Sequence, residues 1–346
     1  MDAVKRWIDG FQQRVHPIAF VVGVVKKFGD DRGGRLAALV AYYGFFSVFP
    51  AMLVFVTVVG FVLEDRPDLR DSLYESAVGQ FPVLGESIAG VSSQPLTGSA
   101  SAIVIGLVTA LWAGLGAMQA AQDAMNDVWA VPRIDHPGFV AKRLRSLLML
   151  VVLGSLLVGS AVLTQVIAAI DILGSVSRSS LFVGSVVLTS AVFVLSFHVL
   201  TVADVSWRQL VPGAIFAGTG YALLQLAGQW YVTRVVNGAS ATYGTFAVVI
   251  GLLSWLYIQA QLTMFGAEIN VVAARRLWPR SLFDRVATEA DRTTLVSKVM
   301  QGRLAAGMDV AVTFGGEDPD EAATNGPRPP EPRAVDPTTS SEPTTS

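Results

Sequence analysis

The sequence predicts an all-α, polytopic membrane protein with six transmembrane helices and both termini in the cytoplasm. Three observations support this fold class. Hydrophobic residues make up 52% of the 346-residue chain and charged residues only 15%, which lies outside the usual range of soluble domains. Six runs stay free of charge over the length that a membrane-spanning helix needs, about 20 residues. Lysine and arginine gather at alternate connections between these runs.

Charges and turns set the boundaries of the spans. The fifth and sixth charge-free runs are separated only by Arg234, so the stretch YVTRVVNGASATYG must hold the turn, and the sixth span starts near Tyr243. The expected spans are residues 36–63, 97–122, 146–170, 181–203, 209–233 and 243–267, within a transmembrane domain over 36–275.

The basic residues predict the orientation, because arginine-rich and lysine-rich flanks stay in the cytoplasm. One set of connections carries sixteen of them, namely Lys5, Arg6, Arg14, Lys26, Lys27, Arg32, Arg35, Arg133, Lys142, Arg143, Arg145, Arg208, Arg275, Arg276, Arg280 and Arg285. The other set carries four, namely Arg66, Arg70, Arg178 and Arg234. We therefore expect both ends on the cytoplasmic side of a plasma membrane.

Residues 1–35 are expected to form a basic, amphipathic segment on the inner membrane surface. Apolar residues recur there at helical spacing beside lysine and arginine, namely Trp7, Ile8, Phe11 and Val15. A helix of this kind lies in the plane of the interface. The apolar run IAFVVGVV is followed by KKFGDDRGGR and not by a small-residue cleavage site, which argues against a signal peptide.

The connection over residues 64–96 is expected outside the cell, with one amphipathic helix in it. Leu69, Leu73, Ala77 and Phe81 fall four residues apart, and Pro82 follows them. This spacing gives a helix one apolar face, and the proline ends it. A solvated linker is the alternative.

Two cytoplasmic regions follow the last span. Residues 276–314 form a juxtamembrane segment, in which TTLVSKVMQGRLAAG can form a short helix. Residues 315–346 are rich in Pro, Ser, Thr and acidic residues, a composition that predicts a disordered tail. Such a tail is a candidate binding segment for protein partners.

The composition excludes several kinds of chemistry. The chain has no cysteine, so it has no thiolate nucleophile, iron–sulfur cluster or cysteine-ligated zinc. His16, His136 and His198 are scattered along the chain, and no cofactor or metal site is expected. The net charge of −2 gives no sign of nucleic-acid binding. The expected partners are the lipid bilayer and anionic lipid head groups at the basic cytoplasmic flanks.

Polar residues in the cytoplasmic half of the spans form a candidate polar vestibule that would receive a head group or an amine. They are Gln119, Asp123, Asn126, His198, Gln261 and Glu268. Helical spacing places Gln261 and Glu268 on one face. The alternative is structural: Glu268 marks where the sixth span stops at the inner interface and pairs with Arg143 or Arg145 at the start of the third span.

Four bulky residues near the middle of the membrane are candidates for lining a cavity, namely Pro50, Trp112, Tyr221 and Trp255. Trp and Tyr normally favour the membrane interfaces, so their central position indicates either a cavity or simple core packing. The middle layer has no ionisable group, which argues against coupling to ions.

Four stretches together resemble the YihY/virulence factor BrkB family of bacterial inner-membrane proteins. They are LAALVAYYGFFSVFPAMLVF, LWAGLGAMQAAQDAMNDVW, WRQLVPGAIFAG and YGTFAVVIGLLSWLYIQAQLTMFGAEIN. The resemblance covers residues 35–276 and implies a six-helix protein of the bacterial inner membrane. The family also carries an old label as a ribonuclease. RNA hydrolysis needs a base, an acid or metal ions held by clustered side chains, and the sequence has no such cluster.

Three functions remain open, in decreasing order of support. The first is a transporter or exporter of a lipidic or amphipathic envelope component, favoured by the charge-free middle layer and the central aromatic residues. The second is a non-transporting scaffold that recruits envelope partners. The third is a membrane-embedded enzyme at the cytoplasmic interface. The sequence leaves the substrate, the energy source and the oligomeric state undetermined.

Overall fold

The structure is a computed structural model that describes residues 2–62, 65–67, 70–71, 100–152, 178–231, 234, 245–283, 288–305, 308 and 310–314. Within these residues the chain is helical and contains no strand. The elements are α1 (Asp2–Arg14), α2 (His16–Asp30), α3 (Gly33–Val62), α6 (Ala100–Val128), the short 3₁₀ helix η2 (Arg133–Asp135), α8 (Arg178–Leu200), α9 (Trp207–Tyr231), α11 (Thr245–Arg275) and α12 (Glu289–Gln301). A further helical segment covers 139–152.

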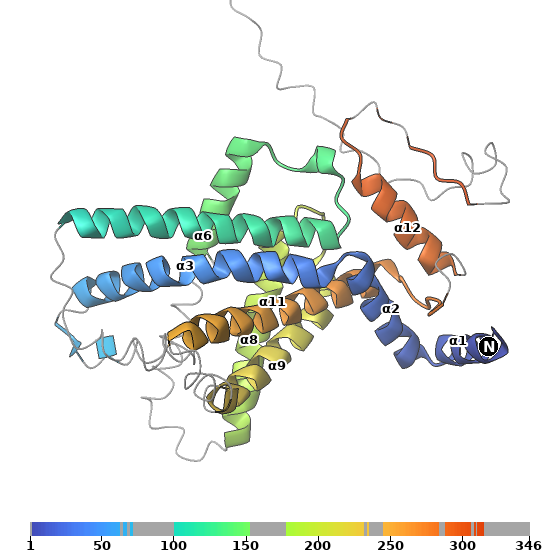
Figure 1. The fold of residues 1–346 in the computed structure, drawn as a ribbon, viewed down its shortest axis with the longest axis horizontal. Coiled ribbons are helices and arrows are strands. Elements are labelled where there is room, and N and C mark those ends of the chain that lie inside the picture. Colours follow the sequence, from blue (N-terminus) through green and yellow to red (C-terminus); the bar gives the residue numbers. More distant parts are fainter. Residues whose placement is uncertain are drawn as a thin grey trace, which may run out of the picture.

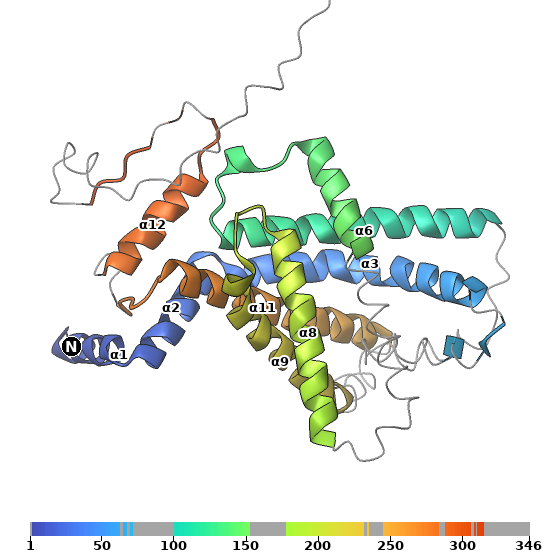
Figure 2. The ribbon, with the colours of Figure 1, turned by 180° about the vertical axis from the view of Figure 1, so that it is seen from behind.

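The long helices form two groups that meet at α11. In one group α3 and α6 lie side by side, and in the other α8 packs on α9 (Figure 1). Helix α11 contacts α9, α3, α6 and α2, so it is the shared element of the bundle. Figure 2 shows the same arrangement from behind, with α1, α2 and α12 together at one end.

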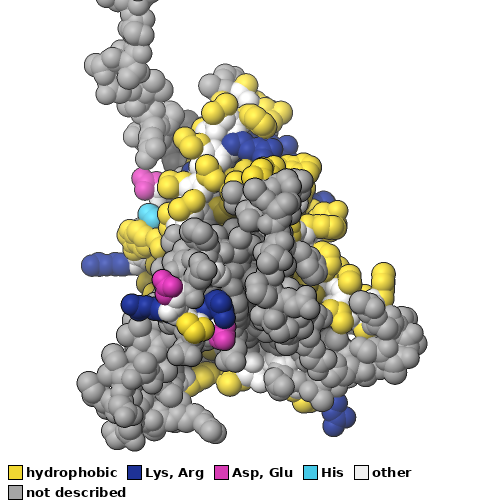
Figure 3. Space-filling model, turned by 90° about the vertical axis from the view of Figure 1, so that its left-hand side faces the viewer, with side chains coloured by type: hydrophobic (Ala, Val, Ile, Leu, Met, Phe, Trp, Pro, Cys, Tyr) yellow, Lys and Arg dark blue, Asp and Glu magenta, His cyan; other side chains and the backbone are white. Residues whose placement is uncertain are grey.

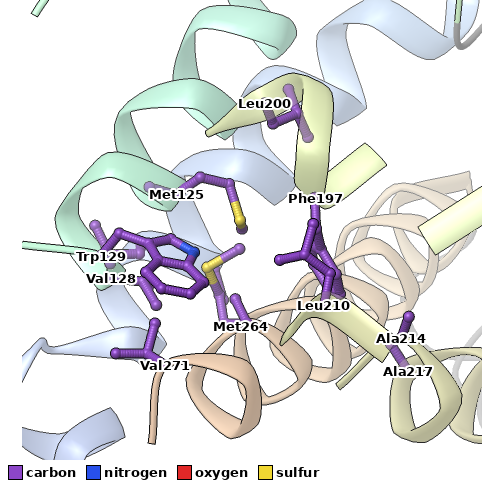
Figure 4. Close-up of a cluster of buried hydrophobic side chains, with 14 of the residues drawn as sticks. Met125, Val128, Trp129, Phe197, Leu200, Leu210, Ala214, Ala217, Met264 and Val271 are labelled. Atoms are coloured by element: carbon purple, nitrogen blue, oxygen red, sulfur yellow. The ribbon is translucent and has the colours of Figure 1, made fainter. Parts of the chain in front are cut away.

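The hydrophobic core lies where α6, α8, α9 and α11 meet (Figure 4). The residues buried there are Met125 of α6, Trp129 just after α6, Phe197 of α8, Leu210 of α9 and Met264 of α11. Large side chains from four helices interlock at this point, as close packing of an interior requires.

Glycine allows α9 and α11 to touch through their backbones. A Cβ atom at Gly213 would lie 1.8 Å from the carbonyl oxygen of Gly266, and Asn270 accepts a hydrogen bond of 2.7 Å from the Gly213 N–H. Ala217 lies one turn further along α9, beside Gly266. Small residues four apart commonly mark such close approach in membrane helices.

The helices agree with five of the six expected spans in position. By length and composition, three stretches among the described residues can cross a membrane, Phe182–Leu200, Trp207–Gly228 and Phe246–Arg275. Helices α3 and α6 cover the first two expected spans and are 30 and 29 residues long. Most of the third expected span, most of the loop 64–96 and the tail 315–346 lie outside the described residues. The six-span count and the orientation stay predictions.

Apolar side chains are exposed along the outer faces of the long helices. Val104, Val108, Leu226 and Trp230 are examples, and Figure 3 shows hydrophobic surface at one end of the molecule. Large exposed apolar side chains along a helix mark a face that is covered by lipid or by another protein.

The segment after α11 is docked against the N-terminal helices. Asp291 of α12 is fully buried and accepts hydrogen bonds from Arg280 Nε (2.8 Å), Lys26 Nζ (3.1 Å) and the Ser281 N–H (3.1 Å). Thr288 caps α12 by accepting from the Asp291 N–H (3.2 Å) and donating its hydroxyl to the Asp291 carboxylate (2.8 Å), a reciprocal cap. Arg280, Ser281 and α12 are therefore tied to α2.

Candidate functional site

An ionic cluster joins three helices at the end of the bundle that is expected to face the cytoplasm. It consists of Lys27 of α2, Asp31 just after α2, Glu268 of α11 and Lys298 of α12. Lys27, Asp31 and Glu268 are buried, with exposed fractions of 3%, 5% and 0%. Charged side chains are almost never buried to this degree unless they are paired.

Lys27 is the central group of the cluster. Its ammonium pairs with Asp31, lies 3.4 Å from Glu268 Oε2 and donates a hydrogen bond of 3.0 Å to the carbonyl of Val128. The last contact satisfies a carbonyl at the end of α6, where helical carbonyls lack partners and a cation is favourable. One lysine therefore connects α2, α6 and α11.

The cluster has no formal net charge when all four groups are ionised, because two lysines face two carboxylates. Asp31 forms an ion pair with each lysine, with Lys27 through one carboxylate oxygen and with Lys298 through the other. Glu268 differs, since its Oε1 atom is buried and accepts no hydrogen bond from the described residues. A buried acceptor without a partner costs about 1–3 kcal/mol, so Glu268 is the incomplete member of the cluster.

The ion-pair partner of Glu268 in the structure differs from the partners expected from the sequence. Lys27 is its partner, whereas the Arg145 guanidinium donates to the carbonyls of Val199 (3.2 Å) and Thr201 (2.8 Å) and Arg143 lies over the ring of Phe139. The sixth expected helix also does not stop there, because α11 continues to Arg275. The reason is that Lys27 balances the charge, so the carboxylate can lie inside the bundle.

The other members of the expected vestibule are distributed over separate contacts. Asp123 pairs with Lys142 at 2.7 Å, the buried Asn126 accepts a hydrogen bond of 3.1 Å from the Val202 N–H, and His198 stacks on Trp207. Gln119 and Gln261 make no side-chain hydrogen bond to the described residues. Glu268 is thus the one predicted vestibule residue that belongs to the ionic cluster.

The four residues expected to line a central cavity are in different environments. Trp255 is 1% exposed and packs beside Tyr231, as the core-packing alternative requires. Trp112 is 73% exposed on the outside of α6 and so does not line a cavity between the described helices. Tyr221 accepts a hydrogen bond from Gln225 (2.8 Å), and Pro50 is half-buried within α3.

A pocket of about 460 Å³ opens next to the ionic cluster, and we call it the inner pocket. Its lining comes from the α2–α3 junction, the end of α6, η2 and the end of α12, and includes Asp31, Arg32, Arg35, Asp127, Arg133 and Lys298. Asp31 and Lys298 belong to both the pocket and the cluster. The inner pocket is therefore continuous with the buried charges beneath it.

The cluster contains residues that the sequence analysis used only for orientation. Lys27 and the arginines of the inner pocket belong to the basic flanks, where membrane topology already explained them. One signal was available: Lys27 and Asp31 stand four residues apart in KKFGDD, the spacing of a helical ion pair. The contacts with Glu268 and Lys298 connect segments more than two hundred residues apart, which no local pattern reveals.

Several known proteins similar to this chain are described as membrane proteins. An inner membrane protein, YhjD of Escherichia coli (strain K12), is 23% identical over 287 residues, which cover 78% of this chain and 85% of YhjD. YfkH of Bacillus subtilis (strain 168), described as ribonuclease-like, is 24% identical over 75% of this chain and 96% of its own length. A UPF0761 membrane protein of Nitrosospira multiformis is 23% identical over 77% of this chain and 63% of that protein. No solved structure is significantly similar.

The family assignment rests on a match over most of the chain. The family model described as virulence factor BrkB matches residues 24–289. The matched region begins in α2 and ends at the start of α12, so it contains Lys27, Asp31 and Glu268 but not Lys298. The chain is a membrane protein that belongs to the virulence factor BrkB family.

Proposed function

We propose that this protein is a transporter or exporter that moves an amphipathic envelope component with a polar head group across the plasma membrane. The observation that carries the proposal is the ionic cluster of Lys27, Asp31, Glu268 and Lys298, buried at the end of a bundle of apolar helices. Ionisable groups at such positions are costly and commonly mark the path of a substrate.

The incomplete bonding of Glu268 supports the same function. Its free Oε1 atom is an acceptor that a donor on an incoming molecule would satisfy. The inner pocket provides the approach, because Asp31 and Lys298 lie both in the cluster and on the pocket wall. A head group that enters the pocket would compete for these ion pairs, and the exposed apolar helix faces would hold its hydrocarbon part in the membrane. The proposal assigns the protein no enzymatic step.

Movement of a lipid in reconstituted vesicles tests the proposal. The purified protein is placed in vesicles with phosphatidylglycerol that carries a nitrobenzoxadiazole dye, and dithionite added outside reports how fast inner-leaflet dye becomes accessible. We expect movement with the wild type and about tenfold slower movement for Glu268→Gln, which corresponds to about 1.4 kcal/mol in the barrier. The control is Asp135→Asn, which removes an exposed carboxylate of η2 outside the pocket lining.

The second candidate function is a non-transporting scaffold. It is favoured by α1, whose apolar residues Trp7 and Phe11 are 70% and 53% exposed and would suit a protein partner as well as a membrane surface. Wild-type vesicles that behave like protein-free vesicles would refute transport of this lipid and favour the scaffold. Lipid profiles of a deletion strain, with and without the Glu268→Gln gene, extend the test to native envelope lipids.

A further inference from the structure

We propose that the inner pocket is a binding site for a phosphate group, held by Arg32, Arg35 and Arg133. This inference deepens the proposed function, on which it rests for the role of the pocket, by naming the chemical group that is recognised. The three arginines come from the α2–α3 junction, the first turn of α3 and η2, and all three line the pocket.

The three guanidinium groups are available for a ligand. Arg32, Arg35 and Arg133 are exposed, and their side chains form no ion pair or hydrogen bond with the part of the chain that the structure describes. Each guanidinium carries five N–H donors and stays charged at any physiological pH. The pocket therefore offers many charged donors that make no hydrogen bond within its own lining, and only Arg133 has a carboxylate, Asp127, close enough to interact with its charge.

The carboxylates of the pocket are already engaged. Asp31 pairs with Lys27 and Lys298, and Asp30 pairs with Arg280 at 2.8 Å. Asp127 accepts a hydrogen bond of 2.7 Å from Gln301 of α12. The acidic residues hold neighbouring segments together, so the arginines are the groups that remain for an anion.

The backbone at Arg32 gives a second, independent observation. Its φ angle is 54°, in the left-handed region, which costs a residue with a Cβ atom about 1–2 kcal/mol and which glycine adopts without strain. This junction follows the end of α2, where glycine is the common residue. Arg32 combines this strain with a place in the pocket lining, and the two features together favour a role of its side chain in ligand binding.

Three arginines from separate segments suit a phosphate better than a carboxylate. A guanidinium binds two oxygens of one phosphate in a planar fork, and a phosphate presents oxygens in several directions, so groups from three segments can share it. The volume of about 460 Å³ leaves room for more than the phosphate alone. Both a phospholipid head group and a soluble phosphate supply this chemistry.

Binding to the purified full chain in a neutral detergent tests the assignment. The probes are inorganic phosphate and dihexanoyl phosphatidylglycerol, each titrated at low ionic strength by calorimetry and by thermal shift. We expect Arg32→Gly to weaken binding about tenfold or more, since each lost charged hydrogen bond contributes that much, while its melting temperature stays equal or rises. Arg133→Ala should weaken binding similarly.

The matched control is Arg276→Gly. Arg276 is also an exposed arginine with a left-handed backbone, at φ 52° after α11, but it does not line the pocket. Its replacement should leave affinity unchanged. Saturation by inorganic phosphate identifies a soluble phosphate as the source, and saturation by the lipid alone identifies a head group; either result supports the site.

Three results would overturn the inference: no binding of either probe to the wild type, wild-type affinity in Arg32→Gly, or equal weakening in Arg276→Gly. The binding assay needs no movement of lipid, so it separates this inference from the proposed function. Binding without movement would leave the phosphate site intact and refute transport of the dye-labelled lipid.

Discussion

Replacing Asp291 with asparagine should release α12 from the N-terminal helices. The Asp291 carboxylate is fully buried and receives four donors, from Arg280, Lys26, Ser281 and Thr288. Asparagine has nearly the same shape but offers one acceptor oxygen and no charge. The perturbation therefore tests the bonding of the carboxylate with little change in packing.

The magnitude follows from the four contacts. Losing the charge weakens the bonds from Arg280 and Lys26 by about 1 kcal/mol each, since bonds to charged groups contribute about 1.5–3 kcal/mol and neutral ones about 0.5–1.5 kcal/mol. The Ser281 N–H then faces an amide N–H, and an unsatisfied buried donor costs about 1–3 kcal/mol. The total is about 3–5 kcal/mol, which matches the usual cost of breaking a buried pair.

Acid should produce the same release in the wild type. Burial raises the pKa of Asp291, but the hydrogen bonds from Ser281, Arg280, Thr288 and Lys26 outweigh it, so the net pKa is lowered. A carboxyl group whose folded-state pKa is lowered stabilises the docked state above its unfolded value, about 3.9, and loses that contribution as pH falls through the lowered value. Undocking should therefore begin below about pH 4.

Hydrogen exchange of peptides from 289–301 in the purified protein measures this local opening. We expect the protection of α12 to fall in Asp291→Asn at neutral pH and in the wild type under acid, with no further acid effect in the variant. Glu289→Gln is the control. Glu289 is exposed in the same helical turn as Asp291, and its replacement removes the same charge. Unchanged protection in Asp291→Asn, or equal loss in Glu289→Gln, would refute the reasoning.

Three further predictions concern packing, topology and the tail. Gly213→Ala should lower the free energy of unfolding by about 1–3 kcal/mol or more, because its Cβ atom would meet a carbonyl of α11. The control Gly184→Ala has open space around the new Cβ atom and should stabilise the protein by up to about 1 kcal/mol. Equal melting temperatures of the two variants would contradict the close contact of α9 with α11. A reporter fused after Leu96 should be external and one after Arg285 cytoplasmic, and the opposite location at either site would refute the topology. Deleting Gly316–Ser346 should leave the melting temperature unchanged, and a clear decrease would show that the tail contributes to the fold.

The helical class and the position of the five long helices were predictable, because the hydrocarbon core selects for long apolar runs. The family resemblance identified from four stretches is confirmed by the match over residues 24–289. Helix ends were less predictable: α6 runs to Val128 and α11 to Arg275, beyond the apolar runs. Hydropathy marks where lipid ends, whereas a helix continues as long as its polar side chains find partners. Asn126 and Glu268 find theirs in other segments.

The candidate site was only partly predictable, for a related reason. Glu268 stood out as a carboxylate at the end of an apolar run, but its partner was expected among nearby arginines of the third span. The partner is Lys27, because α2 packs against α11. A buried ion pair depends on which helices touch, and the periodicity of one helix does not determine that.

Besides other lysines and arginines that pair with carboxylates, two groups of basic residues differ at this end of the bundle once the chain has folded. Lys27 donates to the carbonyl of Val128 and Arg275 to that of Trp129, both at the C-terminal end of α6. Arg145 donates to the carbonyls of Val199 and Thr201 at the end of α8. Cations are favourable at these helix ends. The exposed arginines of the inner pocket complete no helix end. During insertion every one of these charges can contribute to orientation, since none is yet paired. In the folded protein the second group makes no ion pair or hydrogen bond with the described residues, so a change that removes a pocket arginine should affect ligand binding. A change that removes a helix-capping cation should affect stability.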